Sequence, residues 1–149
     1  MKVTTRSESM DLESQSEPER FTGLAGFRVL HTMDMGVTPP AGASASPDTL
    51  AAGTGTWNTY PGNVSMVRYE PGVRSHWHSH SGGQMLFVVE GDGWVQSRGS
   101  DPIAIQMGDA ISIAPGEEHW HGAKNGAALA HVTVTAGRPT WFEESPTPE

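Results

Sequence analysis

The sequence predicts an all-β domain, and three observations lead to this prediction. The chain of 149 residues contains 18 glycines and 11 prolines, which favour many turns. From about Trp57 onward, short segments rich in Val, Ile, Phe and Thr alternate with turns rich in Gly, Pro and Asp. No segment shows a helical period over a useful length. These features are typical of a β-sandwich or β-barrel, and the length suits one domain.

The N-terminal part differs from the rest in composition. Residues 1–20 are rich in Ser and Glu and poor in apolar side chains, so we expect a disordered acidic tail. Residues 21–56 begin with an alternation at Phe27, Val29 and His31 that indicates a strand. A long stretch rich in Pro, Ala and Gly follows, and we expect a strand or arm that continues into a loop.

Residues 57–142 contain the predicted barrel, and residues 143–149 form a short C-terminal tail. Each expected strand is short, rich in β-branched or aromatic residues, and bounded by turn residues. The expected strands are 64–69, 74–80, 84–90, 94–97, 103–106, 110–114, 118–121 and 128–135. Turns containing Gly separate most of them, as in a barrel built from short antiparallel strands.

Composition excludes several classes of function. The chain has no cysteine, which excludes disulfides, thiolate catalysis, zinc ribbons and iron–sulfur clusters. Its net charge of −8 disfavours a nucleic-acid partner. No apolar run approaches the roughly 18 residues of a membrane span, and the N-terminus has no hydrophobic signal region. We therefore expect a cytoplasmic protein with no nucleic-acid or membrane partner.

The histidines form a pattern that suggests metal binding. Six of the seven histidines lie between positions 76 and 131. Since alternate residues of a strand share a face, His76, His78 and His80 are expected on one face, and His119 and His121 on one face of a later strand. Neutral imidazoles are good ligands for divalent first-row metals. A pair from one strand and a third histidine from another would leave metal positions open for substrate.

Two stretches of the chain resemble the two sequence motifs of the cupin family at every spacing. They are Gly72-x5-His78-x-His80-x3-Gln84-x6-Gly91 and Gly108-x5-Ala114-x-Gly116-x2-His119. Gln84 takes the place of a usual Glu, Ala114 that of a usual Pro and Ala123 that of a usual Asn. The resemblance covers about residues 57–142. It implies a single cupin barrel of the jelly-roll type with a metal inside.

A narrower resemblance concerns the small bacterial cupins that include manganese-dependent hydroxynitrile lyases. It rests on Trp-His-x-His-x3-Gln from Trp77, Gly-x-Gly-Trp-Val-Gln from Gly91 and Pro-Gly-Glu-x-His-Trp-His-Gly-Ala from Pro115. It implies one divalent ion per chain, manganese first, with iron, nickel and zinc as alternatives. The implied ligands are His78, His80, Gln84 and His119. A pocket histidine that handles protons in that group matches His131 by position.

Three further histidines are candidates for catalysis. His131 shares a strand face with Thr133 and Thr135 and is a candidate general base, with a structural hydrogen bond as the alternative. His121 is a candidate for the pocket wall or for a partner of a ligand imidazole. His76 is a candidate acid or base, and the alternative is a histidine satisfied at the barrel rim.

Two other residues are candidates for substrate binding. Arg74 precedes the ligand segment and would hold an anionic substrate, or else pair with a surface carboxylate. Trp120 lies between two histidines and would stack on a substrate, or else pack between strands.

The predicted function is that of a metal-dependent enzyme acting on a small oxygenated organic molecule. Lyase chemistry of the hydroxynitrile-lyase type comes first. The alternatives are a dioxygenase that uses O2 on a diketone or enediol, an isomerase or cyclase of small-molecule biosynthesis, and a non-enzymatic cupin that binds a metabolite. We also expect a homodimer, because open-edged cupin sheets often pair and residues 21–35 offer an exchanging arm.

Overall fold

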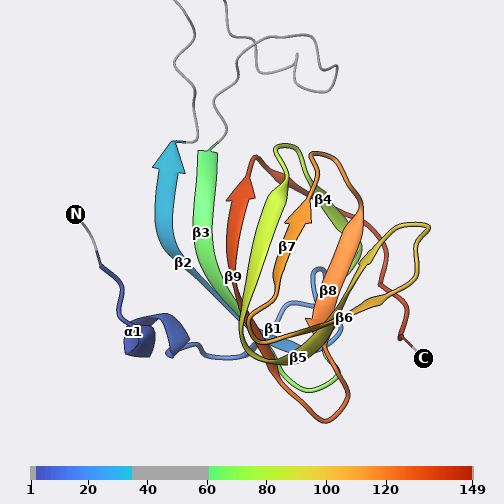
Figure 1. Cartoon of the computed structure of the whole chain (residues 1–149), viewed down its shortest axis with the longest axis horizontal. Helices are drawn as coiled ribbons and strands as arrows, with labels where there is room; N and C mark the ends of the chain where they lie inside the picture. Colours follow the sequence, from blue (N-terminus) through green and yellow to red (C-terminus); the bar gives the residue numbers. More distant parts are fainter. Residues whose placement is uncertain (1–2, 35–60, 149) are drawn as a thin grey trace, which may run out of the picture.

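A computed structural model describes residues 3–34 and 61–148, and strands make up most of the regular structure (Figure 1). In chain order, the elements are α1 (Arg6–Met10), β1 (Gln15–Ser16), β2 (Leu24–Asp34), β3 (Pro61–Tyr69), β4 (His78–His80), β5 (Gln84–Ser97), β6 (Ile103–Gln106), β7 (Ala110–Ile113), β8 (His119–Ala123), β9 (Leu129–Ala136) and β10 (Pro139–Trp141). The predicted all-β class is confirmed. The predicted loop at 36–56 and the first residues of the predicted barrel, 57–60, lie outside the described residues.

All strand pairs are antiparallel, in the order β1-β2-β3-β9-β5-β8-β4-β10, and β6 and β7 also pair with β5. The strand β5 connects the two sides of the barrel. Its first half pairs with β9 and β7, and its second half with β8 and β6. The sheet therefore curls on itself into an open barrel (Figure 1).

The bend inside β5 corrects one prediction. The sequence suggested two strands, 84–90 and 94–97, with a turn between them, whereas the structure has one continuous strand. Gly91 has a φ of 78°, and the pairing with β9 shifts register between Val88 and Glu90. A bulge and a glycine at positive φ allow a strand to bend sharply without ending. The turn residues thus mark a corner of the barrel.

The predicted strand 74–80 is also shorter in the structure, where only His78–His80 forms β4. The residues before it bind several different partners. Arg74 bridges to Gly122 and Ser75 to Phe21. The backbone N–H of Trp77 donates to the carbonyl oxygen of Glu143 at 3.1 Å. A segment that changes partner at each residue does not keep the alternation of a strand.

The N-terminal residues contain two short elements and lead into the barrel. Thr5 caps the short helix α1 through a capping box with Glu8, and Gln15 and Ser16 of β1 pair with β2. Backbone hydrogen bonds from 17–22 then lead the chain to the barrel. No helix in the described part of the chain is long and apolar enough to cross a membrane.

The interior of the barrel changes from apolar to polar along its strands. The apolar end is a cluster of buried side chains: Phe21, Ala25, Val67, Tyr69, Val88, Val95, Ile105, Ala123 and Leu129. Further along β3 and β9 the inward residues become polar: Ser65, Asn63, Thr133 and Thr135. The apolar cluster supplies the packing that holds the strands together. The polar end leaves space for a site.

Candidate metal centre

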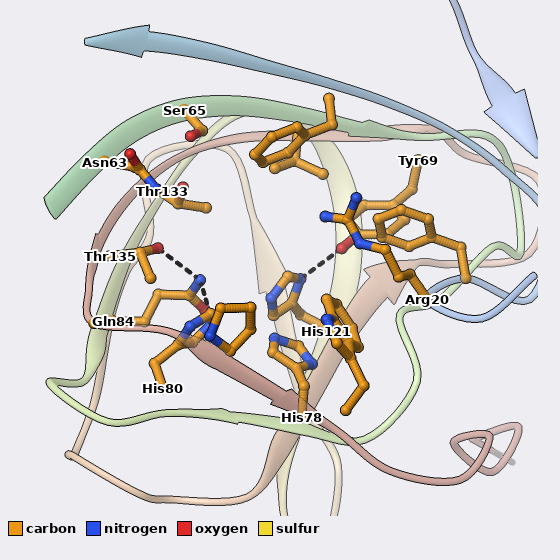
Figure 2. Close-up of a pocket in the computed structure, with 16 residues that line it drawn as sticks. Arg20, Asn63, Ser65, Tyr69, His78, His80, Gln84, His121, Thr133 and Thr135 are labelled. Carbon is orange, nitrogen blue, oxygen red and sulfur yellow. Dashed lines mark hydrogen bonds between the residues drawn. The ribbon is translucent and has the colours of Figure 1, made fainter. Parts of the chain in front are cut away.

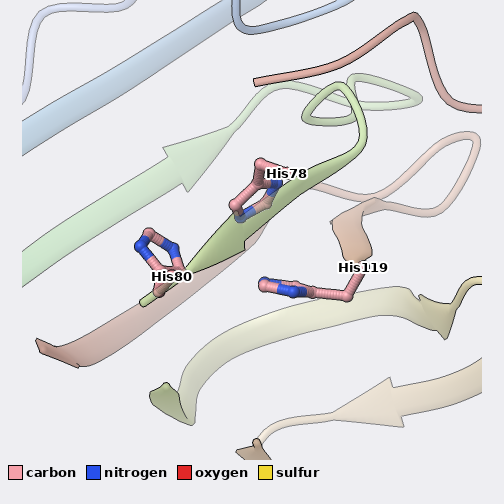
Figure 3. A group of neighbouring side chains, drawn as sticks. All are labelled: His78, His80 and His119. Atoms are coloured by element: carbon pink, nitrogen blue, oxygen red, sulfur yellow. The ribbon is translucent and has the colours of Figure 1, made fainter. Parts of the chain in front are cut away.

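Three buried imidazoles converge inside the barrel. His78 and His80 come from β4, where alternation puts them on one face, and His119 comes from β8 (Figure 3). The β4–β8 pairing sets His78 directly opposite His119. Their ligand atoms all lie within 4.8 Å of one another. Small side-chain rotations would close these imidazoles around one ion at metal–nitrogen distances of about 2.1 Å.

Backbone carbonyls fix two of these imidazoles in the tautomer that metal binding requires. The Nδ1–H of His78 donates to the carbonyl oxygen of His76 at 2.9 Å. The Nδ1–H of His119 donates in the same way to the carbonyl oxygen of Glu117 at 2.8 Å. Each ring therefore keeps the Nε2 lone pair free. A second-nitrogen hydrogen bond of this kind orients a histidine ligand and sets its tautomer.

The amide of Gln84 completes the group. Its Nε2 donates to Thr135 Oγ1 at 3.0 Å and lies 3.0 Å from His80 Nε2. Because Thr135 holds the amide nitrogen, Gln84 Oε1 points to the other side, where it lies 3.1 Å from His119 Nε2. The result is a neutral oxygen ligand beside three imidazole nitrogens.

The electrostatics of the group also fit a cation. Burial lowers the pKa of His78 well below its usual value, lowers that of His80 to about 4, and lowers that of His119. The rings are therefore neutral near pH 7, as ligands must be. His80 Nδ1 is buried and has no hydrogen-bond partner in the described part of the chain. The donor set of three neutral imidazoles and one amide oxygen fits a divalent transition metal ion.

A second group of buried rings lies beside the first. His121 Nδ1 lies 2.9 Å from the Tyr69 hydroxyl and 3.2 Å from His131 Nε2. The rings of His121 and His78 are 5.1 Å apart, centroid to centroid. Burial lowers the pKa of His121 well below its usual value and that of His131 to about 4. His121 Nε2 has no hydrogen-bond partner among the described residues, so it is free to meet a ligand.

Both groups adjoin one cavity of about 580 Å³, its open mouth included, a size that suits a small organic molecule (Figure 2). His78, His80, Gln84 and His121 lie along one side of it. A polar wall consists of Asn63, Ser65, Thr133 and Thr135. An aromatic wall consists of Phe21, Phe27 and Trp141. Trp141 stacks on the ring of His78 at 4.7 Å, which also fixes that ligand.

Comparison with known families identifies the domain. Residues 65–135 match the model of the cupin domain family, and this range contains the whole histidine cluster. The chain contains a cupin domain. The predicted cupin fold is also found in solved structures. A cupin-like protein from Thermotoga maritima is 29% identical, with a TM-score of 0.67, over 91% of this chain and 88% of the other.

Two more proteins are similar to this chain. The polyketide cyclase RemF from Streptomyces resistomycificus shares the fold, with a TM-score of 0.61 and 18% identity over 99% of this chain and 89% of that one. The (R)-mandelonitrile lyase of Granulicella tundricola is 44% identical over 68 residues, which is 46% of this chain. The match spans 52%, about half, of the length of that lyase.

The structure places His76 differently from the prediction. The bend at Trp77 breaks the alternation, and His76 is absent from the described residues that line the cupin cavity. What His76 offers to the site is its backbone carbonyl, which orients His78. His131 does share a face with Thr133 and Thr135, as predicted, but it lies behind His121 and not on the cavity wall.

The two predicted substrate-binding residues also lie away from the cavity wall. The guanidinium of Arg74 is buried and donates to the carbonyl oxygens of Gly72 at 3.2 Å and Ser145 at 3.4 Å. Trp120 is fully buried, and its Nε1–H donates to Gln96 Oε1 at 2.7 Å. Arg74 therefore ties the C-terminal segment to the cupin barrel, and Trp120 packs within it.

The sequence reasoning gave no role to several cavity residues, and Arg20, Tyr69 and Trp141 are the most important of them for the chemistry of the site. Tyr69 has the same parity as Val67 in the predicted strand 64–69, and this signal would have placed it inside the barrel. Arg20 and Trp141 carried no such signal, because their neighbours in the chain show no strand pattern that points inward.

Proposed function

We propose that this cupin is a metal-dependent lyase for a small oxygenated substrate, with cyanohydrin cleavage as its best-matched reaction. In this proposal His78, His80, His119 and Gln84 hold one divalent ion, with manganese as the first candidate. His121, with His131 behind it, moves the proton of the substrate hydroxyl.

The observation that carries the proposal is the position of His121 Nε2. This nitrogen is buried and has no hydrogen-bond partner among the described residues, and its ring lines the cavity together with His78, His80 and Gln84. Its ring lies 5.1 Å from that of His78. A neutral imidazole next to a cation site is suited to take a proton from an oxygen that the cation polarises.

The related lyase supports the choice of reaction. The name of that enzyme gives (R)-mandelonitrile as the compound on which it acts, and 44% of 68 aligned residues are identical. Mandelonitrile has a hydroxyl group on the carbon atom that is attached to its aromatic ring. The cavity has histidines on one side and an aromatic wall of Phe21, Phe27 and Trp141. Its polar and aromatic parts therefore match the hydroxyl and the ring of such a molecule.

The residues of the chain perform the proton step as follows. In the tautomer with hydrogen on Nδ1, His121 donates toward His131 Nε2 or Tyr69 Oη and keeps the Nε2 lone pair in the cavity. Nε2 takes the hydroxyl proton of the cyanohydrin. The C–CN bond then breaks, its electron pair leaves with cyanide, and the carbonyl forms. Cyanide takes the proton back from His121 and leaves as hydrogen cyanide. A bound divalent cation supplies Lewis acidity toward the substrate oxygen.

Release of benzaldehyde from mandelonitrile by the manganese-loaded protein tests this proposal. We expect activity in the native chain, and a loss of about 100-fold or more in His121→Ala with the metal content unchanged. His78→Ala should lose both metal and activity. His76→Ala is the matched control, because it removes a neighbouring imidazole but keeps the carbonyl that orients His78.

Equal rates in the native chain, His78→Ala and His121→Ala would rule out the lyase. Consumption of O2 by the iron-loaded protein with a 1,3-diketone, in the absence of lyase activity, would favour a cupin dioxygenase instead.

A further inference from the structure

One charged residue lines the cavity and has no part in the proposed lyase step. Among the described residues that line the cavity, Arg20 is the one with a formal charge at neutral pH. Figure 2 shows its guanidinium reaching toward the middle of the cavity, on the same side as His121 and Tyr69. Its carbonyl oxygen accepts the N–H of His76 at 2.7 Å, so its backbone is fixed beside the segment that leads into β4.

Aromatic rings surround this guanidinium. Its carbon atom Cζ lies 5.1 Å from the ring centroid of Phe21 and 5.2 Å from those of Phe27 and Trp141. The side chain keeps 27% of its surface exposed. Contact with ring faces holds a guanidinium in place and reduces its contact with water. Because less water surrounds the guanidinium, its attraction to an anion in the cavity is stronger.

The guanidinium already pairs with a carboxylate. Nη1 of Arg20 donates to Glu17 Oε2, three residues earlier in the chain, and the Glu17 side chain is 30% exposed. An ion pair with this exposure contributes little to stability, so a ligand carboxylate can compete with Glu17 at small cost. The pair also leaves the other guanidinium nitrogens for a second carboxylate oxygen.

The charge balance of the cavity favours an anion. The described residues that line it include no carboxylate. A divalent cation held by the histidine cluster would add to the positive charge that Arg20 brings to the cavity. A small anionic molecule would therefore be drawn into the cavity.

We propose that Arg20 binds a carboxylate of the natural ligand, and that the site takes small aromatic molecules that carry an acid group in addition to the hydroxyl or carbonyl oxygen that faces the histidine cluster. In the proposed lyase step, the substrate is then a cyanohydrin that also bears a carboxylate. This inference rests on the proposed function for the location of the site and adds the class of substrate. The sequence had suggested this role for Arg74, which points away from the cavity into the protein. Arg20 takes it because the N-terminal segment folds over the open side of the barrel.

Calorimetric titration of the full-length protein with mandelate and mandelamide tests this inference. The two probes differ in charge and little in shape. We expect Arg20→Gln to weaken mandelate binding about tenfold or more and to leave mandelamide binding unchanged. Arg28→Gln is the matched control, since Arg28 pairs with Asp11 and lies outside the cavity. The titrations are made with the manganese-loaded protein and with the metal-free protein, so a failure of the metal site does not hide the effect of Arg20.

Glu17→Gln gives an independent measurement if Arg20→Gln folds poorly. Loss of the competing carboxylate should increase mandelate affinity by about threefold to tenfold, with mandelamide unchanged. If Arg20 only fastens the N-terminal segment, both variants would lower the melting temperature without changing the ratio of mandelate to mandelamide affinity. That result would overturn the proposal.

Discussion

Two groups of buried histidines lie side by side in this barrel, and they differ in what their nitrogens contact. In the first group, backbone carbonyls bind Nδ1 of His78 and His119, so that the free nitrogens converge. In the second group, His121 bonds to another imidazole, His131, and to the hydroxyl of Tyr69. The first arrangement fixes lone pairs around a point, whereas the second connects groups that can each donate or accept a hydrogen bond.

Under the proposed function, this difference would separate metal binding from proton transfer within one fold. A carbonyl can only accept, so it forces one tautomer on its histidine. An imidazole or a hydroxyl can donate or accept, so both tautomers of His121 remain available. Strand alternation brings both kinds together, because His119 and His121 are neighbours on one face of β8.

The largest expected effect separates the two groups by metal content. His119→Ala removes a ligand of the first group, and we expect its affinity for manganese to fall by more than about 100-fold. His131→Ala should keep about one ion per chain, because that ring lies behind His121. Elemental analysis after dialysis against Mn(II) measures both. Equal metal content in the two variants would show that the two groups do not differ in this way.

In the first group, only the pair of histidines on β4 was predictable from local geometry, and Gln84 and His119 were added by the resemblance to the cupin motifs. Spacings of two residues place His78 beside His80, and turn glycines mark where the strands end. The positions of His76 and Arg20 were not predicted, because they depend on a contact between residues that are distant in sequence. His76 leaves the predicted face because its N–H bonds to Arg20, and Arg20 reaches the cavity through the same contact. The alternation of residues along one strand cannot predict a contact between segments that are this far apart in the sequence.

The next effect concerns the pH dependence of stability and applies to the second group. Burial lowers the pKa of His131 from about 6.5 to about 4, so the unfolded chain binds more protons between these values. Stability is therefore full above pH 6.5 and falls as the pH drops toward 4. For His131 alone, the free energy of unfolding should decrease by about 2 kcal/mol between pH 7.5 and pH 5.

Urea unfolding of the metal-free protein at the two pH values measures this decrease. His131→Phe removes the titrating group, and its pH dependence should be weaker by the same amount. An unchanged slope in this variant would mean that other groups account for the acid sensitivity.

A smaller effect on manganese affinity tests whether Gln84 belongs to the first group. Thr135→Val keeps the shape of the side chain but removes the oxygen that accepts from Gln84 Nε2. The amide is then free to rotate, and we expect the affinity for manganese to fall about tenfold. Thr133→Val is the control, since Thr133 lies on the same wall but has no hydrogen bond to Gln84. Equal affinities in both variants would indicate that Gln84 is not a ligand.

The smallest effect tests the hydroxyl that contacts the second group. Burial raises the pKa of Tyr69, so the hydroxyl stays protonated. Its oxygen lies 2.9 Å from His121 Nδ1 and can accept the Nδ1–H in the tautomer that the lyase step uses. Tyr69→Phe removes this hydroxyl and keeps the ring that packs against Phe21 at 5.7 Å. We expect a loss of about 1 kcal/mol in the free energy of unfolding, unchanged metal content, and a change of about threefold to tenfold in lyase rate. Rate and metal affinity are measured on the same preparations. A fall in metal affinity would place Tyr69 with the first group, whereas an unchanged rate would leave His131 as the residue that positions His121.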